Sequence, residues 1–154
     1  VYDKGCSLAA FFYREGMDNM LNPFDKRGKT WNVWADATEL ADFQNIADAL
    51  IPLHGETDPF WVTSARQIFV DTAYKMRKEK SPSNFKLLAM LLTSALENIS
   101  KYLERTDSAT LVSSEAGKTA ISIKAILATY VRSLRFLVEA EDRNPKDDVF
   151  SIRK

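Results

Sequence analysis

The sequence predicts a mainly all-α fold: a helical bundle of about five to six helices, with short β-strands at the N-terminus and a return to strand at the C-terminus. Two observations carry this prediction. Between residues 36 and 143 apolar residues recur at three- and four-residue spacing, whereas residues 1–34 hold short aromatic-rich runs separated by turn residues. With 154 residues, 45% of them hydrophobic, the chain is long enough to bury a core.

The N-terminal segment is expected to contribute strands. Residues 1–3 and 8–13 flank the turn residues Lys4-Gly5, which favours two strands around a turn. Pro23 disfavours helix in the residue before it, so residues 21–25 are expected to be extended chain entering a turn. Because a lone strand pair is marginal in water, we expect the sheet to be completed elsewhere and the chain to be excised from a longer protein.

The first helix of the bundle is predicted over residues 36–50. Asp36, followed three residues later by Glu39, resembles a capping box with Asp in place of Ser or Thr. Pro52 is expected to stop the helix. An apolar stripe at helical spacing lies between these signals: Leu40, Phe43, Ile46, Ala47 and Leu50.

The central helix is predicted to begin at the motif Asp58, Pro59, Phe60, Trp61 and to run to about Glu79. Asp58 suits the N-cap, and Pro59 suits the first helical position, where its missing N–H costs nothing. The residues that follow form one apolar stripe: Trp61, Ala65, Ile68, Phe69, Ala73 and Met76. We therefore expect the other helices to pack around this one.

Three shorter helical segments are predicted next. Ser83 suits the N-cap of a helix that runs through Leu92. Residues 94–97 have the Ser-x-x-Glu pattern of a capping box, which predicts a helix to about Arg105. Asp107 is expected to cap one more turn through Val112.

The longest helix is predicted from about residue 114 to residue 141. Its apolar seam alternates at three- and four-residue steps: Ala120, Ile123, Leu127, Tyr130, Leu134 and Leu137. Lys118, Lys124, Arg132 and Arg135 fall on an adjacent arc of about 120° and so form a basic stripe. Asn144-Pro145 is expected to end the helix, and residues 149–152 are expected to return to strand.

The charges cancel overall, 21 Lys and Arg against 21 Asp and Glu, but they are not evenly mixed. Residues 31–64 contain no Lys or Arg, residues 75–86 carry five cations and one acid, and residues 116–138 contain no acid. The alternative, that these runs only keep helix faces solvated, stays open. The candidate DNA-binding residues are Lys75, Arg77, Lys78, Lys80, Lys86, Lys124, Arg132 and Arg135. The candidate protein-partner residues are Asp36, Glu39, Asp42 and Asp48.

No catalytic or metal site is recognisable in the sequence. One histidine, His54, and one cysteine, Cys6, exclude a zinc site of the usual Cys/His type, and a single cysteine favours a reducing compartment. Gly117-Lys118-Thr119 resembles the tail of a phosphate-binding loop, but Val112 stands where its first glycine belongs and no strand is predicted before it. No apolar run is long enough to cross a membrane.

Several motifs, taken in order, resemble a known family. They are Tyr2-Asp3-Lys4-Gly5, Leu21-Asn22-Pro23-Phe24-Asp25-Lys26-Arg27, Trp31-Asn32-Val33-Trp34, Leu50-Ile51-Pro52, Asp58-Pro59-Phe60-Trp61 and Thr119-Ala120-Ile121-Ser122-Ile123. Over essentially the whole chain, this combination resembles the type IV secretion coupling proteins, in particular the TraD branch of conjugative coupling ATPases.

The resemblance implies a domain plan. Such proteins combine an N-terminal membrane anchor, a RecA-like motor domain and an all-α domain inserted into the motor domain. Residues 1–35 would then be flanking strands of the nucleotide-binding motor domain, 36–143 the all-α domain, and 144–154 the return into the motor domain. Because the Walker A and B segments are not found, this chain is not expected to hydrolyse ATP, and ATP and Mg²⁺ would belong to the parent protein.

The resemblance also implies a function in substrate recognition. The all-α domain would engage DNA or the relaxase-bearing nucleoprotein complex on the cytoplasmic side. The parent, a homohexameric ATPase anchored in the bacterial inner membrane, would then deliver that substrate to the secretion channel. The chain itself is expected to be a monomer without direct membrane contact. The alternative is a protein-recognition or ring-architecture domain with no direct DNA contact. No exposed aromatic is expected among the cations, so base stacking is not expected.

Overall fold

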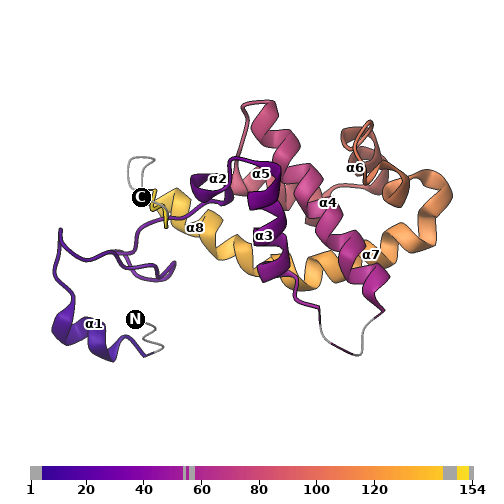
Figure 1. The fold of residues 1–154 in the computed structure, drawn as a ribbon. Helices are drawn as coiled ribbons and strands as arrows, with labels where there is room; N and C mark the ends of the chain where they lie inside the picture. The colour runs from indigo at the N-terminus through magenta and orange to yellow at the C-terminus, as the bar shows by residue number, and fades with distance from the viewer. Residues whose placement is uncertain (1–4, 54, 56–57, 144–148, 153–154) are drawn as a thin grey trace.

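The computed structural model describes residues 5–53, 55, 58–143 and 149–152, and these residues are mainly helical (Figure 1). The α-helices are α1 (Ser7–Phe12), α2 (Val33–Asp36), α3 (Leu40–Leu50), α4 (Pro59–Lys78), α5 (Asn84–Leu88), α6 (Leu96–Tyr102), α7 (Gly117–Val131) and α8 (Arg135–Arg143). Shorter helical turns are a π-turn at Ala89–Thr93 and 3-10 turns at Ala109–Val112, Ser114–Ala116 and Arg132–Leu134. The predicted helical bundle is confirmed.

The centre of the fold is α4, as the sequence predicts. Asp58 is its N-cap, with the Asp58 carboxylate accepting a hydrogen bond from Phe60 N at 3.0 Å, and Pro59 is its first residue. Helices α3 and α7 both pack against α4, which lies between them in Figure 1. Half of the twenty residues of α4 are therefore buried.

The core is shared by helices that are distant in sequence. Phe43 of α3, Phe69 of α4, Leu87 of α5 and Leu127 of α7 each have 0–1% of their surface exposed. Burying a side chain of this size contributes about 1.5–3 kcal/mol. The packing of these faces therefore holds α3, α4, α5 and α7 together.

The N-cap of α3 lies three residues later than the sequence predicts, at Glu39 instead of Asp36. Glu39 is its N-cap, and the Asp42 carboxylate accepts hydrogen bonds from Glu39 N and Thr38 N, both at 2.9 Å. The predicted capping box starting at Asp36 is wrong, because Asp36 is the last residue of α2 and its carboxylate binds other donors.

The strand predicted over residues 8–13 is also wrong. Residues 8–12 belong to α1, and Tyr13 is its C-cap; Ala10 N donates to Cys6 O and Tyr13 N donates to Ala9 O. The helix preference of Leu8-Ala9-Ala10 outweighs the strand preference of the aromatic residues. Cys6 is the N-cap of α1, with φ 53. The strand expected over residues 1–3 lies outside the described residues.

The C-terminal segment returns to the start of the fold but forms little strand. Val149 makes a parallel bridge with Thr30, and Phe150 N donates to Thr30 O at 2.7 Å. The strand predicted over 149–152 is reduced to this bridge, because one neighbouring segment cannot complete a ladder. The predicted helix end at Asn144-Pro145 and the single histidine, His54, lie outside the described residues.

Three predicted helical segments differ in their caps or their extent. The predicted capping box at Ser94 is wrong, because the Ser94 hydroxyl donates to Ala89 O, earlier in the chain, at 3.0 Å. The N-cap of α6 is Ala95, which makes no side-chain hydrogen bond, and the helix ends at Tyr102. The predicted Asp107 cap is likewise replaced by Ser108. The long last helix is divided by the 3-10 turn Arg132–Leu134, which packs against α5.

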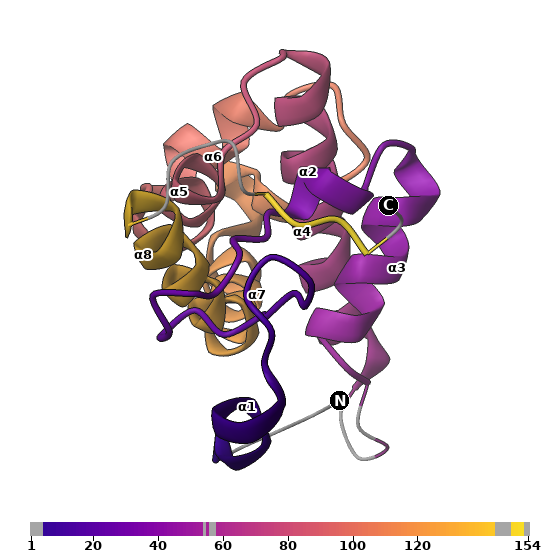
Figure 2. The ribbon, with the colours of Figure 1, turned by 90° about the vertical axis from the view of Figure 1, so that its left-hand side faces the viewer.

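The N-terminal arm, defined as residues 5–29, extends from the helical body (Figures 1 and 2). It carries exposed apolar side chains: Leu8, Phe11, Phe12, Met17, Leu21 and Phe24. Buried Asn84 ties the chain after the arm to α5 by donating to Trp31 O at 3.2 Å and accepting from Val33 N at 3.4 Å. Among the described residues, every helix is too short or too polar to cross a membrane.

Candidate nucleic-acid interface

Two stretches without acidic residues lie next to each other in the fold. Residues 80–96 and 116–138 contain no Asp or Glu. Helix α5, from the first stretch, packs against the turn Arg132–Leu134 and against α8, which begins in the second. The π-turn Ala89–Thr93 likewise packs against α7. We call the exposed part of these two stretches the acid-free surface. Helices α5 and α8 lie on the left-hand side of Figure 2.

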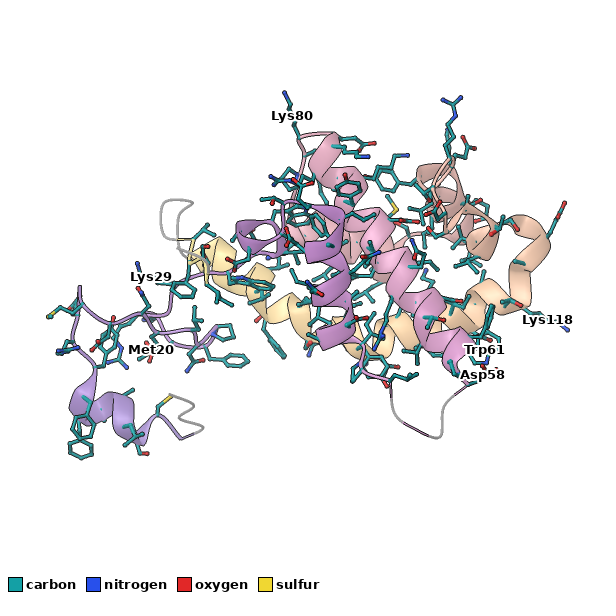
Figure 3. The ribbon with its side chains drawn as sticks, viewed as in Figure 1. Met20, Lys29, Asp58, Trp61, Lys80 and Lys118 are labelled. Carbon is teal, nitrogen blue, oxygen red and sulfur yellow. The ribbon has the colours of Figure 1, made fainter. Side chains whose placement is uncertain are left out.

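Most cations of the acid-free surface are free to meet an anionic ligand. The exposed ones are Lys80, Lys86, Lys118, Arg132 and Arg135. Figure 3 shows Lys80 and Lys118 projecting from two different ends of the helical body. Without carboxylates in the same stretches, these charges attract anions with little local competition.

Two of the candidate cations instead bind the protein's own backbone. Lys124 Nζ donates to Ser94 O, in the loop before α6, and is half-buried. Lys75 Nζ donates to Tyr102 O, the last residue of α6, and lies 4.8 Å from the centre of the Tyr102 ring. Tyr102 ends α6 and Ser94 ends the π-turn Ala89–Thr93, and a cation at the carbonyl end of a helix is favourable, so both lysines join neighbouring helical elements.

The remaining basic candidates of α4 lie in its last turn, beside the negative end of the helix dipole. Arg77 is half-buried, and Lys78 is exposed with its Nζ 4.3 Å from the centre of the Tyr74 ring. Nearby, Tyr102 donates to Glu79 Oε2 at 3.0 Å; burial and this contact raise the pKa of Tyr102. Lys75, Arg77 and Lys78 therefore also stabilise the end of α4.

One exposed aromatic residue does lie among the cations, so the expectation of none is wrong. Phe85 is 64% exposed and directly precedes Lys86. Its neighbours Asn84, Leu87 and Leu88 are buried, which leaves residue 85 on the solvent side of α5. The signal was present in the sequence, because a helix this short has a single core face and Phe85 falls outside it.

The arm reaches the start of α8 through an aromatic contact. The Phe24 and Phe136 rings meet edge to face with centroids 4.9 Å apart, and the Arg135 guanidinium lies 5.0 Å from the Phe136 ring centre. Aromatic pairs of this kind add about 0.5–1.5 kcal/mol beyond burial. The exposed Arg135 is thereby held beside the loop of the arm.

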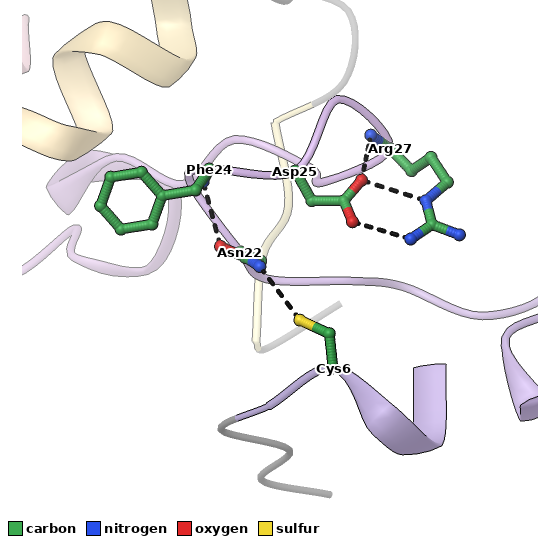
Figure 4. Close-up of polar contacts among 5 residues, drawn as sticks. All are labelled: Cys6, Asn22, Phe24, Asp25 and Arg27. Atoms are coloured by element: carbon green, nitrogen blue, oxygen red, sulfur yellow. Dashed lines mark hydrogen bonds and ion pairs between the residues drawn. The ribbon is translucent and has the colours of Figure 1, made fainter. Parts of the chain in front are cut away.

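That loop is ordered by its own polar side chains (Figure 4). Asn22 Oδ1 accepts from Phe24 N at 3.0 Å, and Asn22 Nδ2 donates to Cys6 Sγ at 3.5 Å. Asp25 accepts two hydrogen bonds from the Arg27 side chain, at 3.0 and 2.7 Å, and one from Arg27 N at 2.9 Å. These contacts lower the pKa of Asp25 to about 2. An open hollow lies between this loop and α1.

The acidic candidates lie in α2 and α3, where most contact neighbouring groups. The Asp36 carboxylate accepts from Trp31 Nε1 at 2.7 Å and from Ser151 Oγ at 2.6 Å. Asp42 and Glu39 cap α3. Asp48 is 61% exposed in its side chain and pairs with Arg66 at 2.8 Å.

The Gly117-Lys118-Thr119 run does not fit a nucleotide phosphate. Gly117 begins α7 with helical φ −41 and ψ −56, and the 3-10 turn Ala109–Val112 lies where a phosphate-binding loop needs the end of a strand. Val112 is 3% exposed, so its side chain fills the place of the loop's first glycine. No phosphate-binding role is assigned to this run.

Comparison with known proteins gives consistent matches. The family model for the type IV secretion-system coupling protein DNA-binding domain matches residues 1–154. The chain is 37% identical over 153 residues to the coupling protein TraD of Escherichia coli (strain K12). These aligned residues cover 99% of this chain and 21% of TraD. The chain thus spans about a fifth of this curated relative.

Solved structures of another coupling protein are similar in fold. The plasmid coupling protein TrwB in complex with the non-hydrolysable GTP analogue GDPNP matches with a TM-score of 0.75 and 28% identity, over 92% of this chain and 33% of that chain. TrwB in complex with ADP and Mg²⁺ matches with a TM-score of 0.72 and 29% identity, over 88% of this chain and 31% of that chain.

Proposed function

This chain belongs to the family of type IV secretion-system coupling protein DNA-binding domains, and on that basis we propose that its acid-free surface binds DNA of the transfer complex. The observation that carries the proposal is the packing of α5 against the turn Arg132–Leu134 and α8. This packing brings α5, which carries the exposed Lys86, next to the turn and the start of α8, which carry the exposed Arg132 and Arg135; the acids of α8 begin only at Glu139.

The expected binding is electrostatic and independent of base sequence. Lysine and arginine side chains that contact phosphates release condensed counterions. The association constant therefore falls as the salt concentration raised to a power of about 0.7 to 0.9 for each contact. Four contacts, from Lys80, Lys86, Arg132 and Arg135, predict a loss of about 50- to 150-fold between 50 and 200 mM salt. The zero net charge of the chain predicts weak binding by the chain alone.

For the parent protein we propose the organisation of a coupling ATPase. Residues 36–143 would form its all-α domain, and residues 1–35 and 144–154 would belong to its motor domain. ATP and Mg²⁺ would bind elsewhere in the parent, a homohexamer anchored in the bacterial inner membrane. The domain would present DNA, or the relaxase-bearing complex that carries it, from the cytoplasmic side.

The alternative is recognition of a basic protein partner, or pairing of subunits around a ring, through the acidic residues of α2 and α3. Internal hydrogen bonds to Asp36 and Asp42 support structural roles for those two. Glu39 and Asp48 are exposed and remain the candidates for such a contact.

Fluorescence anisotropy with labelled DNA tests the proposal. We expect Arg132→Gln/Arg135→Gln to weaken binding at about 50 mM salt and to lower the salt slope by about 1.4 to 1.8. The matched control is Lys101→Gln/Arg105→Gln, which removes the same charge from exposed positions outside the acid-free surface. Equal losses in the two variants, or no binding at 50 mM salt, would contradict the proposal. Binding of a relaxase complex that depends on Asp48 would favour the alternative.

A further inference from the structure

The exposed ring of Phe85 is not explained by the packing of the fold. Helix α5 is held by Asn84, Leu87 and Leu88, which are 1%, 0% and 8% exposed, and Phe85 points away from this face at 64% exposed. A phenyl ring exposed to water gains hydrophobic free energy when a ligand covers it, and this ring stands directly beside the exposed cation Lys86.

The charges near Phe85 indicate the chemistry of that ligand. Lys86 follows it on α5, and both side chains are exposed. Among the elements that α5 packs against, the turn Arg132–Leu134 carries Arg132 and α8 begins with Arg135, four residues before its first acid, Glu139. An aromatic face bordered by cations fits a polyanion that also offers flat apolar rings, and a nucleic acid strand has both.

We propose that Phe85 stacks on an unpaired base, so that the acid-free surface prefers single-stranded to double-stranded nucleic acid. This inference rests on the proposed DNA-binding function and adds the strandedness of the ligand. In a duplex the base faces are covered by their neighbours, so a ring on a convex helix cannot reach them. In a single strand the base can rotate onto the ring while Lys86 and Arg132 contact the adjoining phosphates.

The preference should not depend strongly on base identity. Every base has a π-face, and Phe85 carries no hydrogen-bonding group that could read a base edge. The expected ligand is therefore any flexible single strand, with affinity divided between a base-dependent part at Phe85 and a charge-dependent part at the cations.

A comparison of three ligands separates these two parts. The ligands are a 20-nucleotide oligo-dT, a fully abasic strand with the same number of phosphates, and a 20-base-pair duplex, each at about 50 mM salt. We expect the wild-type chain to bind oligo-dT at least about fivefold more tightly than the abasic strand. Phe85→Ala should abolish that difference, and Phe85→Trp should preserve it.

The matched control is Ile121→Ala. Ile121 is 61% exposed on α7, within the same acid-free surface, but an aliphatic side chain cannot stack on a base. This variant should retain the preference for oligo-dT. Thermal unfolding of each variant confirms that the exposed substitutions leave the fold intact.

The outcomes distinguish the inference from the function on which it rests. Equal affinity of the wild type for oligo-dT and the abasic strand, or an unchanged preference in Phe85→Ala, overturns the stacking proposal and leaves DNA binding standing. Absence of binding to all three ligands overturns both. A change of self-association in Phe85→Ala, measured by sedimentation, without a change in DNA affinity also overturns the proposal and assigns the ring to a protein contact.

Discussion

The carboxylate of Asp36 accepts a hydrogen bond from the Ser151 hydroxyl at 2.6 Å, across 115 residues of chain. The same carboxylate accepts from Ile152 N at 3.1 Å and from Trp31 Nε1 at 2.7 Å. Next to it, Thr30 pairs with Val149 in the parallel bridge. Asp36 therefore ties the chain that enters the helical body to the chain that leaves it.

Replacing Asp36 should destabilise the whole domain. We expect Asp36→Ala to lower the free energy of unfolding in urea by about 2–4 kcal/mol, because three donors lose a charged acceptor. The control is Asp48→Ala, which removes an exposed ion pair with Arg66 and should cost no more than about 1 kcal/mol. Equal effects of the two substitutions would show that the Asp36 contacts contribute little.

Lys80 occupies a backbone conformation that suits glycine. It has φ 53 just after α4, where Lys80 N donates to Arg77 O at 2.9 Å and Ser81 N to Met76 O at 3.0 Å. These bonds form a Schellman motif, whose left-handed residue is most often glycine. We expect Lys80→Gly to raise the free energy of unfolding by about 1 kcal/mol.

The control for Lys80 is its helical neighbour. Lys78 is the last residue of α4, and Lys78→Gly removes the same charge. Glycine within a helix costs about 1 kcal/mol, so this variant should be less stable than the wild type. If both variants shift the urea midpoint in the same direction, the conformational explanation is wrong.

Lys124 and Lys118 lie on the same helix but should respond differently to substitution. Lys124→Met leaves Ser94 O without its charged donor, and we expect a loss of about 1–2 kcal/mol in chemical denaturation. Lys118 is exposed, and Lys118→Met should change stability by less than about 0.5 kcal/mol. A stable Lys124→Met protein with reduced DNA affinity would instead assign Lys124 to the ligand.

The Asp25 carboxyl group should titrate with a pKa of about 2, because Arg27 donates side-chain and backbone hydrogen bonds to it. A depressed carboxyl pKa contributes stability above the unfolded value of about 3.9, and that contribution is lost as pH falls through 2. We expect the loop around Asn22 to loosen over this range. Carboxyl ¹³C NMR measures the midpoint, and Arg27→Gln should return it towards 3.9.

Gly28 should not tolerate a side chain. A Cβ at this position would lie 2.3 Å from the backbone oxygen of Asn22, so the loop would have to move. We expect Gly28→Ala to disturb the contact of Phe24 with Phe136, observed as faster amide exchange over residues 22–28. Gly117→Ala is the control, because nothing lies within 4 Å of that Cβ. Unchanged exchange in Gly28→Ala would contradict the expectation.

Local signals in the sequence were sufficient for the helices that depend on local contacts. Asp58 and Pro59 start α4 at the predicted residue, and Ser83 caps α5, because a cap binds backbone groups only two or three residues away. The apolar period likewise identified Phe43, Phe69 and Leu127 as core residues, since a helix turns every 3.6 residues whatever its neighbours are.

The same rules failed where a partner lies far along the chain. Asp36 has the spacing of a helix cap, but its donors include Ser151 and Ile152, which no local pattern can anticipate. A second failure has a local cause: residues 8–13 hold aromatic residues typical of a strand, yet residues 8–12 lie in α1, where the helix preference of Leu8-Ala9-Ala10 outweighs them.

The sequence by itself determined the helical class, the central helix and the two stretches that lack acidic residues, because propensity, capping, periodicity and composition are properties of neighbouring residues. Only the tertiary structure decided that these stretches meet, that Lys75 and Lys124 bind backbone carbonyls, and that Phe85 stays exposed. The physical reason is that packing joins surfaces separated by tens of residues, and solvent exposure is what remains once those surfaces are buried.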